Sequence, residues 1–174
     1  MSSLSFQSQD CEITLNEGLE EYRAYLRANG KKQLTDAPGS QVIRDHDATH
    51  VIFGLDTSIE QESMLDSWVL SATSWKLKQL LAYNQLPEIK ELTKGFRNDP
   101  GYFRLVLTAI KLIPIKLKIW KRSKQMNKKW PFASPDHLMD HRVCDLRKEY
   151  GIKILTPDER MVKKPLIWSG TLKD

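Results

Sequence analysis

Apolar residues recur along most of the chain at intervals of three and four, which is the spacing of one face of an α-helix. Leu19, Tyr22 and Leu26 form one such stripe. The strict alternation that marks a half-buried β-strand is scarce. The spacing predicts helices over residues 16–29, 40–53, 58–84, 87–95, 102–120 and 134–150. We therefore expect an all-α fold of about six helices.

Residues with special backbone properties mark several of the predicted helix ends. Gly30, Gly54 and Gly151 each follow a predicted helix, where glycine can adopt the left-handed conformation that ends it. Asn16 and Ser58 stand at helix starts, and a glutamine three residues after Ser58 completes the pattern of a capping box. The stretch from Gly54 to Ser58 should therefore be a turn between two helices.

The composition favours one globular domain. The chain has 174 residues, of which 40% are hydrophobic, and this is enough for one core but leaves little room for two. Residues 1–12 are expected to be flexible, and residues 153–174 to form an irregular tail with at most a short strand. Two cysteines, Cys11 and Cys144, are too few for a disulfide framework, so a reducing compartment is favoured.

Positive charge is concentrated in one segment of a chain whose net charge is +5. Residues 101–130 contain nine lysines and arginines and no acidic residue. Four of these cations interrupt residues 102–120, the most apolar stretch, so we do not expect it to span a membrane, and Pro114 should break its helix. Aliphatic residues alternate with lysines over residues 111–129, which favours a membrane surface over nucleic acid as the partner.

The start of the chain carries no export signal. Together with the basic segment, this predicts a cytoplasmic protein that is peripheral at the inner face of a membrane. In a eukaryote, removal of a transit sequence would place the same protein on the matrix side of the mitochondrial membrane.

Candidate chemistry is concentrated in the second predicted helix and at the start of the third. His46 and His50 lie about 40° apart around a helix, and Asp47 lies about 100° from His46. On one straight helix Glu62 would be about 24 Å from His46, but a turn at Gly54 would bring it back beside the two imidazoles. These four side chains can form a divalent-metal site.

Two imidazoles and two carboxylates suit zinc first, with iron or manganese as alternatives and magnesium as the less natural choice. The competing interpretation is that His46 is a hydrogen-bonded core histidine, while Asp47 and Glu62 are solvated helix charges. Spacing alone does not decide between them.

A second set of ligand-type residues falls in the last predicted helix. His137, His141 and Cys144 follow one another at spacings of four and three. They could bind one ion only with help from another element, because they spread over two helical turns. A partly exposed helix face is the favoured interpretation.

The motif in the second and third helices resembles the signature of a known family. His46, Asp47, His50 and Glu62 stand in every fixed position of the pattern His-Asp, two residues, His, eleven residues, Glu. This pattern is typical of the fourth protein of the coenzyme Q (ubiquinone) biosynthesis set. Weaker similarity extends over about residues 40–152.

The chain also departs from the family pattern. Asp56 stands where the family usually has proline, and Gln61 stands where it has glycine. Val69 and Leu70 follow Trp68, where an aromatic–acidic pair is expected. These differences indicate a distant member, whose substrate need not be the ubiquinone precursor itself.

The resemblance implies a helical, membrane-associated protein with a metal beside the ring of a polyprenylated aromatic quinone precursor. The family activity is oxidative decarboxylation (a lyase reaction), in which a hydroxyl replaces the carboxyl at ring carbon one. The resemblance makes His46, His50 and Glu62 metal ligands and catalytic residues, and Asp47 either a fourth ligand or the group that orients one imidazole. The alternative is a non-catalytic scaffold that binds isoprenoid lipid and organises other quinone-biosynthesis proteins. The sequence leaves a homodimer open.

Overall fold

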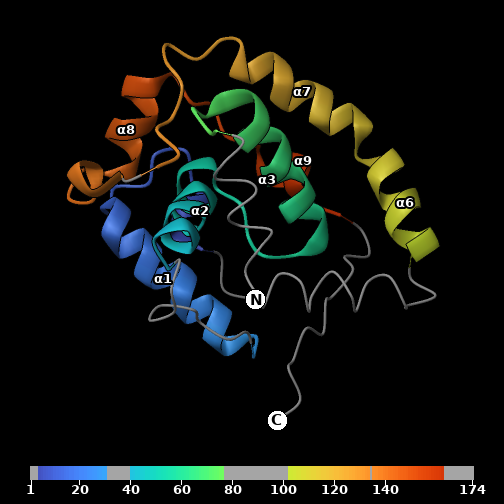
Figure 1. Ribbon diagram of the computed structural model, residues 1–174, viewed down its shortest axis with the longest axis horizontal. Helices are drawn as coiled ribbons and strands as arrows, with labels where there is room; N and C mark the ends of the chain where they lie inside the picture. The colour runs from blue at the N-terminus through green and yellow to red at the C-terminus, as the bar shows by residue number, and fades with distance from the viewer. Residues whose placement is uncertain (1–3, 31–39, 77–101, 134, 163–174) are drawn as a thin grey trace.

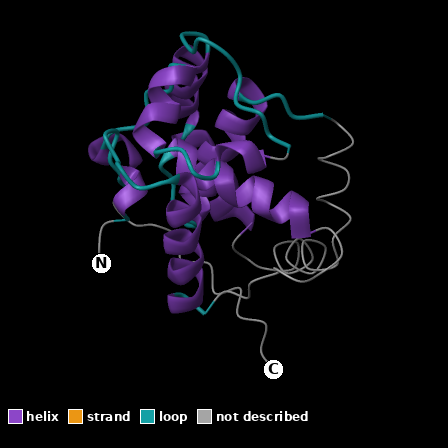
Figure 2. Cartoon of the chain, turned by 90° about the vertical axis from the view of Figure 1, so that its left-hand side faces the viewer, coloured by secondary structure: helices purple, strands orange, loops and turns teal. Residues whose placement is uncertain are grey.

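The computed structural model describes residues 4–30, 40–76, 102–133 and 135–162, which form helices joined by loops (Figure 1). Its α-helices are α1 (Leu15–Ala28), α2 (Ser40–Phe53), α3 (Ile59–Ala72), α6 (Tyr102–Lys111), α7 (Ile113–Ser123), α8 (Val143–Tyr150) and α9 (Pro157–Arg160). Two short 3₁₀ helices, η1 (Ser5–Gln7) and η2 (Pro135–Leu138), accompany them. No β-strand occurs in the described part of the chain, where Figure 2 shows helices and loops. The prediction of an all-α helical domain is confirmed.

Helix α2 lies in the middle of the fold. It packs against α1 and α3, and it also contacts η1 and α8. Helix α7 lies along α3, and α6 joins it at the outer edge of the molecule (Figure 1). The rings of Phe53 on α2 and Trp68 on α3 are fully buried and stack with centroids 4.8 Å apart. Aromatic packing of this kind holds the α2–α3 hairpin closed.

The N-terminal segment is part of the core. Phe6 and Cys11 are buried, although residues 1–12 were expected to be flexible. Burying a phenylalanine ring stabilises a fold by roughly 1.5–3 kcal/mol, and hydrogen bonds from Arg147 to the carbonyls of Phe6 and Ser8 also hold this segment. Helix α1 then begins after Thr14, whose side chain forms a capping box with the glutamate three residues later. The predicted cap, Asn16, lies inside the helix.

Helix α3 is shorter than predicted. It ends at Ala72, whereas the hydrophobic spacing extended it to about residue 84. Thr73 adopts an extended conformation and forms an isolated bridge with Trp130, whose N–H donates to the Ala72 carbonyl over 2.9 Å. A tertiary contact therefore overrides the local helical pattern. The helix predicted over residues 87–95 lies outside the described residues.

The predicted helix stops at proline and glycine are confirmed. Helices α6 and α7 meet at Leu112, and Pro114 lies in the first turn of α7, where its missing N–H costs no helical hydrogen bond. Gly30 and Gly151 have φ values of 66° and 70°, which are the left-handed values expected of helix terminators. Among the described helices none has the length and apolarity needed to cross a bilayer.

The last predicted helix, over residues 134–150, is instead two elements, η2 and α8. The chain between them turns toward the N-terminal segment, and the Val143 N–H donates to the Ile13 carbonyl over 2.9 Å. Beyond α8 the chain is extended before α9, which starts at a capping box of Thr156 and the glutamate three residues later. The irregular tail predicted over residues 153–174 therefore contains a short helix, and the Thr-Pro-Asp-Glu pattern was a signal for it.

Candidate metal centre

The turn between α2 and α3 begins with a glycine cap. Gly54 has a φ of 69° and its N–H donates to the Val51 carbonyl over 3.2 Å, while the Leu55 N–H donates to the His50 carbonyl over 3.0 Å. This pair of bonds is the Schellman arrangement, which satisfies the last carbonyls of a helix. A larger residue would not fit at Gly54 without a shift, because a Cβ added there would lie 2.9 Å from the Cδ1 atom of Ile154. The chain therefore reverses directly after α2, as the sequence predicted.

The same turn orients the imidazole of His50. Its Nδ1 lies 3.2 Å from the carbonyl oxygen of Leu55, and Nδ1 must carry the proton because a carbonyl oxygen can only accept. In the neutral ring the lone pair is then on Nε2, which is buried and has no hydrogen bond. Nε2 lies 3.4 Å from Oε1 of Glu62, which is long for a charge-assisted hydrogen bond. An imidazole oriented in this way is typical of a metal ligand.

Helix α1 covers one face of the His50 imidazole. The ring of Tyr22 stacks on the imidazole, with centroids 4.5 Å apart and planes inclined by 21°. This contact needs a close approach of the two helices, and one turn earlier a Cβ on Gly18 would lie only 2.5 Å from Cγ1 of Val51. Gly18 therefore allows α1 to approach α2 closely enough for Tyr22 to restrict the ring of His50.

A buried arginine from α8 satisfies the end of α2. The Nε of Arg147 donates to the Ile52 carbonyl and its Nη2 to the Val51 carbonyl, each over 2.9 Å. The same guanidinium donates to the carbonyls of Phe6 and Ser8. Burial lowers the pKa of Arg147 to about 10, so it remains charged at pH 7 and complements the negative end of the helix dipole. Arg147 thus ties η1, α2 and α8 together behind the turn.

Glu62 comes from the first turn of α3. Ser58 is the N-cap residue, but its hydroxyl donates to the Asp56 carboxylate over 2.7 Å and does not form the predicted capping box. Instead, the Gln61 side chain accepts from the Asp56 N–H over 2.8 Å and donates to the Asp56 carboxylate over 2.9 Å. Two residues that depart from the family pattern therefore hold this turn together by bonding to each other.

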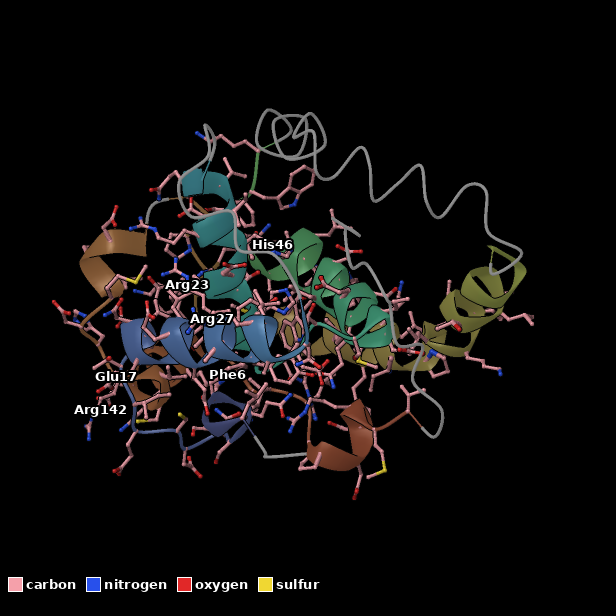
Figure 3. All side chains as sticks on the ribbon, turned by 90° about the horizontal axis from the view of Figure 1, so that it is seen from below. Phe6, Glu17, Arg23, Arg27, His46 and Arg142 are labelled. Atoms are coloured by element: carbon pink, nitrogen blue, oxygen red, sulfur yellow. The ribbon has the colours of Figure 1, made fainter. Side chains whose placement is uncertain are left out.

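His46, His50 and Glu62 converge where α2 faces α3, and Figure 3 labels His46 on α2. Each offers a ligand atom, and these atoms all lie within 4.8 Å of one another. Tetrahedral zinc with bonds of about 2.1 Å separates its ligand atoms by about 3.4 Å, which is the separation found between His50 and Glu62. The cluster of two imidazoles and one carboxylate could therefore hold a divalent metal ion.

The two histidines have different electrostatic surroundings. Burial and the neighbouring His50 lower the pKa of His46 to about 4, so this ring is neutral at pH 7. Burial also lowers the pKa of His50, but Glu62, Asp47 and the Leu55 carbonyl outweigh it, and the net shift is upward. A proton and a divalent cation therefore compete for Nε2 of His50, as they do at metal-binding histidines generally.

Asp47 is not part of the three-residue cluster. Its carboxyl is buried, which raises its pKa to about 7 against the opposing influence of His50 and Arg23. Arg23 belongs to α1, the helix beside α2 (Figure 3). The predicted role of Asp47 as a ligand, or as the group that orients an imidazole, stays a prediction, and the partner of Nδ1 in His50 is the Leu55 carbonyl.

The second set of ligand-type residues does not come together. His137 lies in η2, His141 in the turn after it and Cys144 in α8, so the three do not share one helix. Within the described ranges, the group that could hold a metal is the cluster on α2 and α3. His137 and His141 are exposed, as expected for a surface segment.

Three residues that shape the site had no assigned role in the sequence. Tyr22 was predicted as a member of an apolar stripe, but its contact with His50 depends on how two helices pack. Leu55 acts through its carbonyl, which its side chain does not reveal. Arg147 left a signal, because it stands at helical spacing between Val143 and Tyr150, which are buried with it. A charged residue in an apolar stripe indicates a buried side chain whose polar atoms form hydrogen bonds.

Comparisons with models of known protein families, with curated proteins and with solved structures give no match to this chain. The resemblance to the coenzyme Q family therefore stays a prediction, based on the motif from His46 to Glu62 and on weaker similarity over about residues 40–152. The functional proposal is built on that motif and on the geometry of its side chains.

Proposed function

We propose that the chain binds a divalent metal, zinc first, through His46, His50 and Glu62, and that the metal site handles a polyprenylated quinone precursor. The observation that carries this proposal is the buried Nε2 of His50, which is oriented through the Leu55 carbonyl and faces Glu62 at 3.4 Å. A backbone carbonyl is a usual second partner of a metal-binding histidine. The Glu62 side chain is 37% exposed, so a substrate can approach from its side.

The proposed reaction is oxidative decarboxylation of a hydroxybenzoate-type ring. The bond between ring carbon one and the carboxyl carbon breaks and carbon dioxide leaves. A hydroxyl oxygen from water bonds to that carbon, and two electrons and two protons pass to an external oxidant of the dioxygen class, which is reduced to the peroxide level. When bound, the metal supplies Lewis acidity that holds the substrate oxygens and offsets developing negative charge. Asp47, which is near enough to raise the pKa of His50, is proposed to make that ligand more basic.

Metal analysis of the purified protein tests the site. Wild type should contain one metal per chain, while Glu62→Gln and His50→Ala should lose it, because each removes a ligand. His141→Ala is the matched control, since His141 is an exposed histidine outside the cluster. Circular dichroism confirms that the variants fold. A wild type without stoichiometric metal, or a Glu62→Gln variant that retains it, would refute the site.

A turnover assay separates the enzyme from the scaffold. Metal-loaded protein is incubated in air with a prenylated hydroxybenzoate, and carbon dioxide and the hydroxylated ring are measured by mass spectrometry. The enzyme hypothesis expects both products from wild type and neither from Glu62→Gln. If wild type binds the lipid but leaves its ring carboxyl intact under these conditions, the scaffold alternative replaces the enzyme.

A further inference from the structure

Five of the seven large hydrophobic side chains that are exposed in the described part of the chain lie on α6 and α7. They are 39% to 56% exposed and follow one another at intervals of three and four residues, which places those of each helix on one outward face of that helix. This apolar stripe consists of Leu107, Ile110, Ile113, Leu117 and Trp120. Isolated exposed hydrophobic residues are ordinary, but a contiguous row of them marks an interaction surface.

Packing among the residues that the structure describes does not account for the stripe. Leu112, at the start of α7, and Ile119 are buried in the core on the other side of this helix, which lies along α3. A surface helix needs only one apolar face to join a core. Helix α7 has two, and Figure 1 shows α6 and α7 along the outer rim of the molecule.

Exposed lysines accompany the apolar stripe. Lys111, Lys121 and Lys124 are exposed, and the ammonium of Lys124 lies 5.5 Å from the ring centroid of Trp120. None of these three lysines forms an ion pair with another residue that the structure describes. Since residues 101–130 also contain no acidic residue, this side of the molecule combines apolar contact area with positive charge.

We propose that the apolar stripe docks on the surface of an anionic phospholipid bilayer. Its side chains would enter the boundary between headgroups and acyl chains, Trp120 would lie at the interface, and the lysines would reach the lipid phosphates. Single-stranded nucleic acid fits less well, because it requires aromatic stacking where the stripe has aliphatic residues. Two copies of the chain meeting through this face would bring their lysines together and repel.

The docking surface is independent of the metal site. The stripe and α3, which carries Glu62, lie on opposite sides of α7. Glu62→Gln should therefore bind vesicles as wild type does. A result that refutes the metal site would not refute membrane docking, and a result that refutes membrane docking would not refute the metal site.

Co-sedimentation of the full chain with lipid vesicles tests the proposal. Vesicles of phosphatidylcholine with about one-third phosphatidylserine should bind wild type, and pure phosphatidylcholine vesicles should bind it much less. Each lysine near an anionic surface is expected to contribute about fivefold in affinity at low salt. Lys121→Gln combined with Lys124→Gln should thus weaken binding about 25-fold, and added salt should reduce the difference.

Substitution within the stripe tests its apolar part. Ile113→Ser combined with Leu117→Ser should lower vesicle affinity by about tenfold or more, because both side chains lose their transfer into the lipid boundary. Leu70→Ser is the matched control, since Leu70 is an exposed leucine on α3. A blue shift of tryptophan emission on vesicle addition should disappear in Trp120→Phe.

Several results would overturn the docking proposal. These are a folded wild type that does not bind anionic vesicles, equal binding to both vesicle types, or wild-type binding by the double-serine variant. Self-association that this variant abolishes, in a protein that ignores vesicles, would assign the stripe to a second copy instead. If the double-serine variant does not fold, the two-lysine and Trp120→Phe variants still decide the question, because both change exposed side chains.

Discussion

Replacing Arg147 should destabilise the fold more than replacing a surface arginine, because its guanidinium supplies hydrogen bonds to several chain segments at once. Arg147→Met preserves much of the side-chain length and removes every donor. The carbonyls of Val51 and Ile52 at the end of α2, and those of Phe6 and Ser8 near η1, would lose their bonds from this residue. The substitution therefore acts directly behind the turn that orients His50.

The expected cost follows from two opposing effects. The Val51 carbonyl keeps its bond from Gly54, and the bond from Arg147 to the Gln9 carbonyl is weak at 3.4 Å. The carbonyls of Ile52, Phe6 and Ser8 therefore account for most of the loss, at about 2 kcal/mol each. Burial lowers the pKa of Arg147 from 12.5 to about 10, which corresponds to roughly 3 kcal/mol of charge burial that the substitution relieves. The net loss in the free energy of unfolding should be about 3 kcal/mol.

Urea denaturation measures this loss through the midpoint, with an unchanged slope showing that the transition is the same. Arg147→Lys should fall between wild type and Arg147→Met, because an ammonium cannot reproduce the planar fork of donors. Arg142→Met is the matched control at the opposite, N-terminal end of α8, where an exposed arginine pairs with exposed Asp145, and it should cost less than about 0.5 kcal/mol. A loss below about 1 kcal/mol for Arg147→Met would show that these carbonyls do not depend on Arg147.

Three further expectations concern the turn, pH and metal. Gly54→Ala places a side chain at positive φ and should cost at least about 1–2 kcal/mol in urea denaturation; wild-type stability would contradict the glycine requirement. Burial raises the pKa of Glu159, but hydrogen bonds from Lys118, a neighbouring amide and Arg122 outweigh it and lower the pKa to about 2. The stabilising contribution of ionised Glu159 is therefore complete above about pH 5 and is lost toward pH 2. Over that window the free energy of unfolding of wild type should fall by about 1–2 kcal/mol more than that of Glu159→Gln, measured by urea midpoints at each pH. Zinc at about 100 times its dissociation constant should stabilise wild type by about 2.7 kcal/mol in calorimetry and leave Glu62→Gln unchanged.

The sequence predicts those parts of the site that depend on local geometry. His46 and His50 share a helix face because they are four residues apart, and Gly54 is a helix stop because of its backbone freedom. The position of Glu62 beside the two imidazoles required only that the third helix run back along the second. These statements depend on residues within one helix turn, or on two helices that are adjacent in sequence, so no knowledge of the remaining fold was needed.

Features that depend on tertiary contacts could not be predicted in the same way. Helix α3 stops at Ala72 because the chain pairs with Trp130, which is far away in sequence. Asp56 and Gln61 looked like defects in a family pattern, yet they bond to each other across the turn. The capping box expected at Ser58 was wrong for the same reason, because the glutamine it required is engaged by Asp56.

The arrangement of charge at the hairpin explains why a cation fits between these helices. The last turn of α2 is its electronegative end, while Glu62 stands in the first turn of α3, where the helix dipole favours a carboxylate. Arg147 neutralises the end of α2 from behind, on the side of η1 and α8. On the side of Glu62, the buried Nε2 of His50 has only a contact of 3.4 Å with Oε1 of Glu62, which leaves this buried atom poorly satisfied, at a local cost to the fold. Natural sequences retain such a local cost mainly at functional sites, and a metal bound there would remove it.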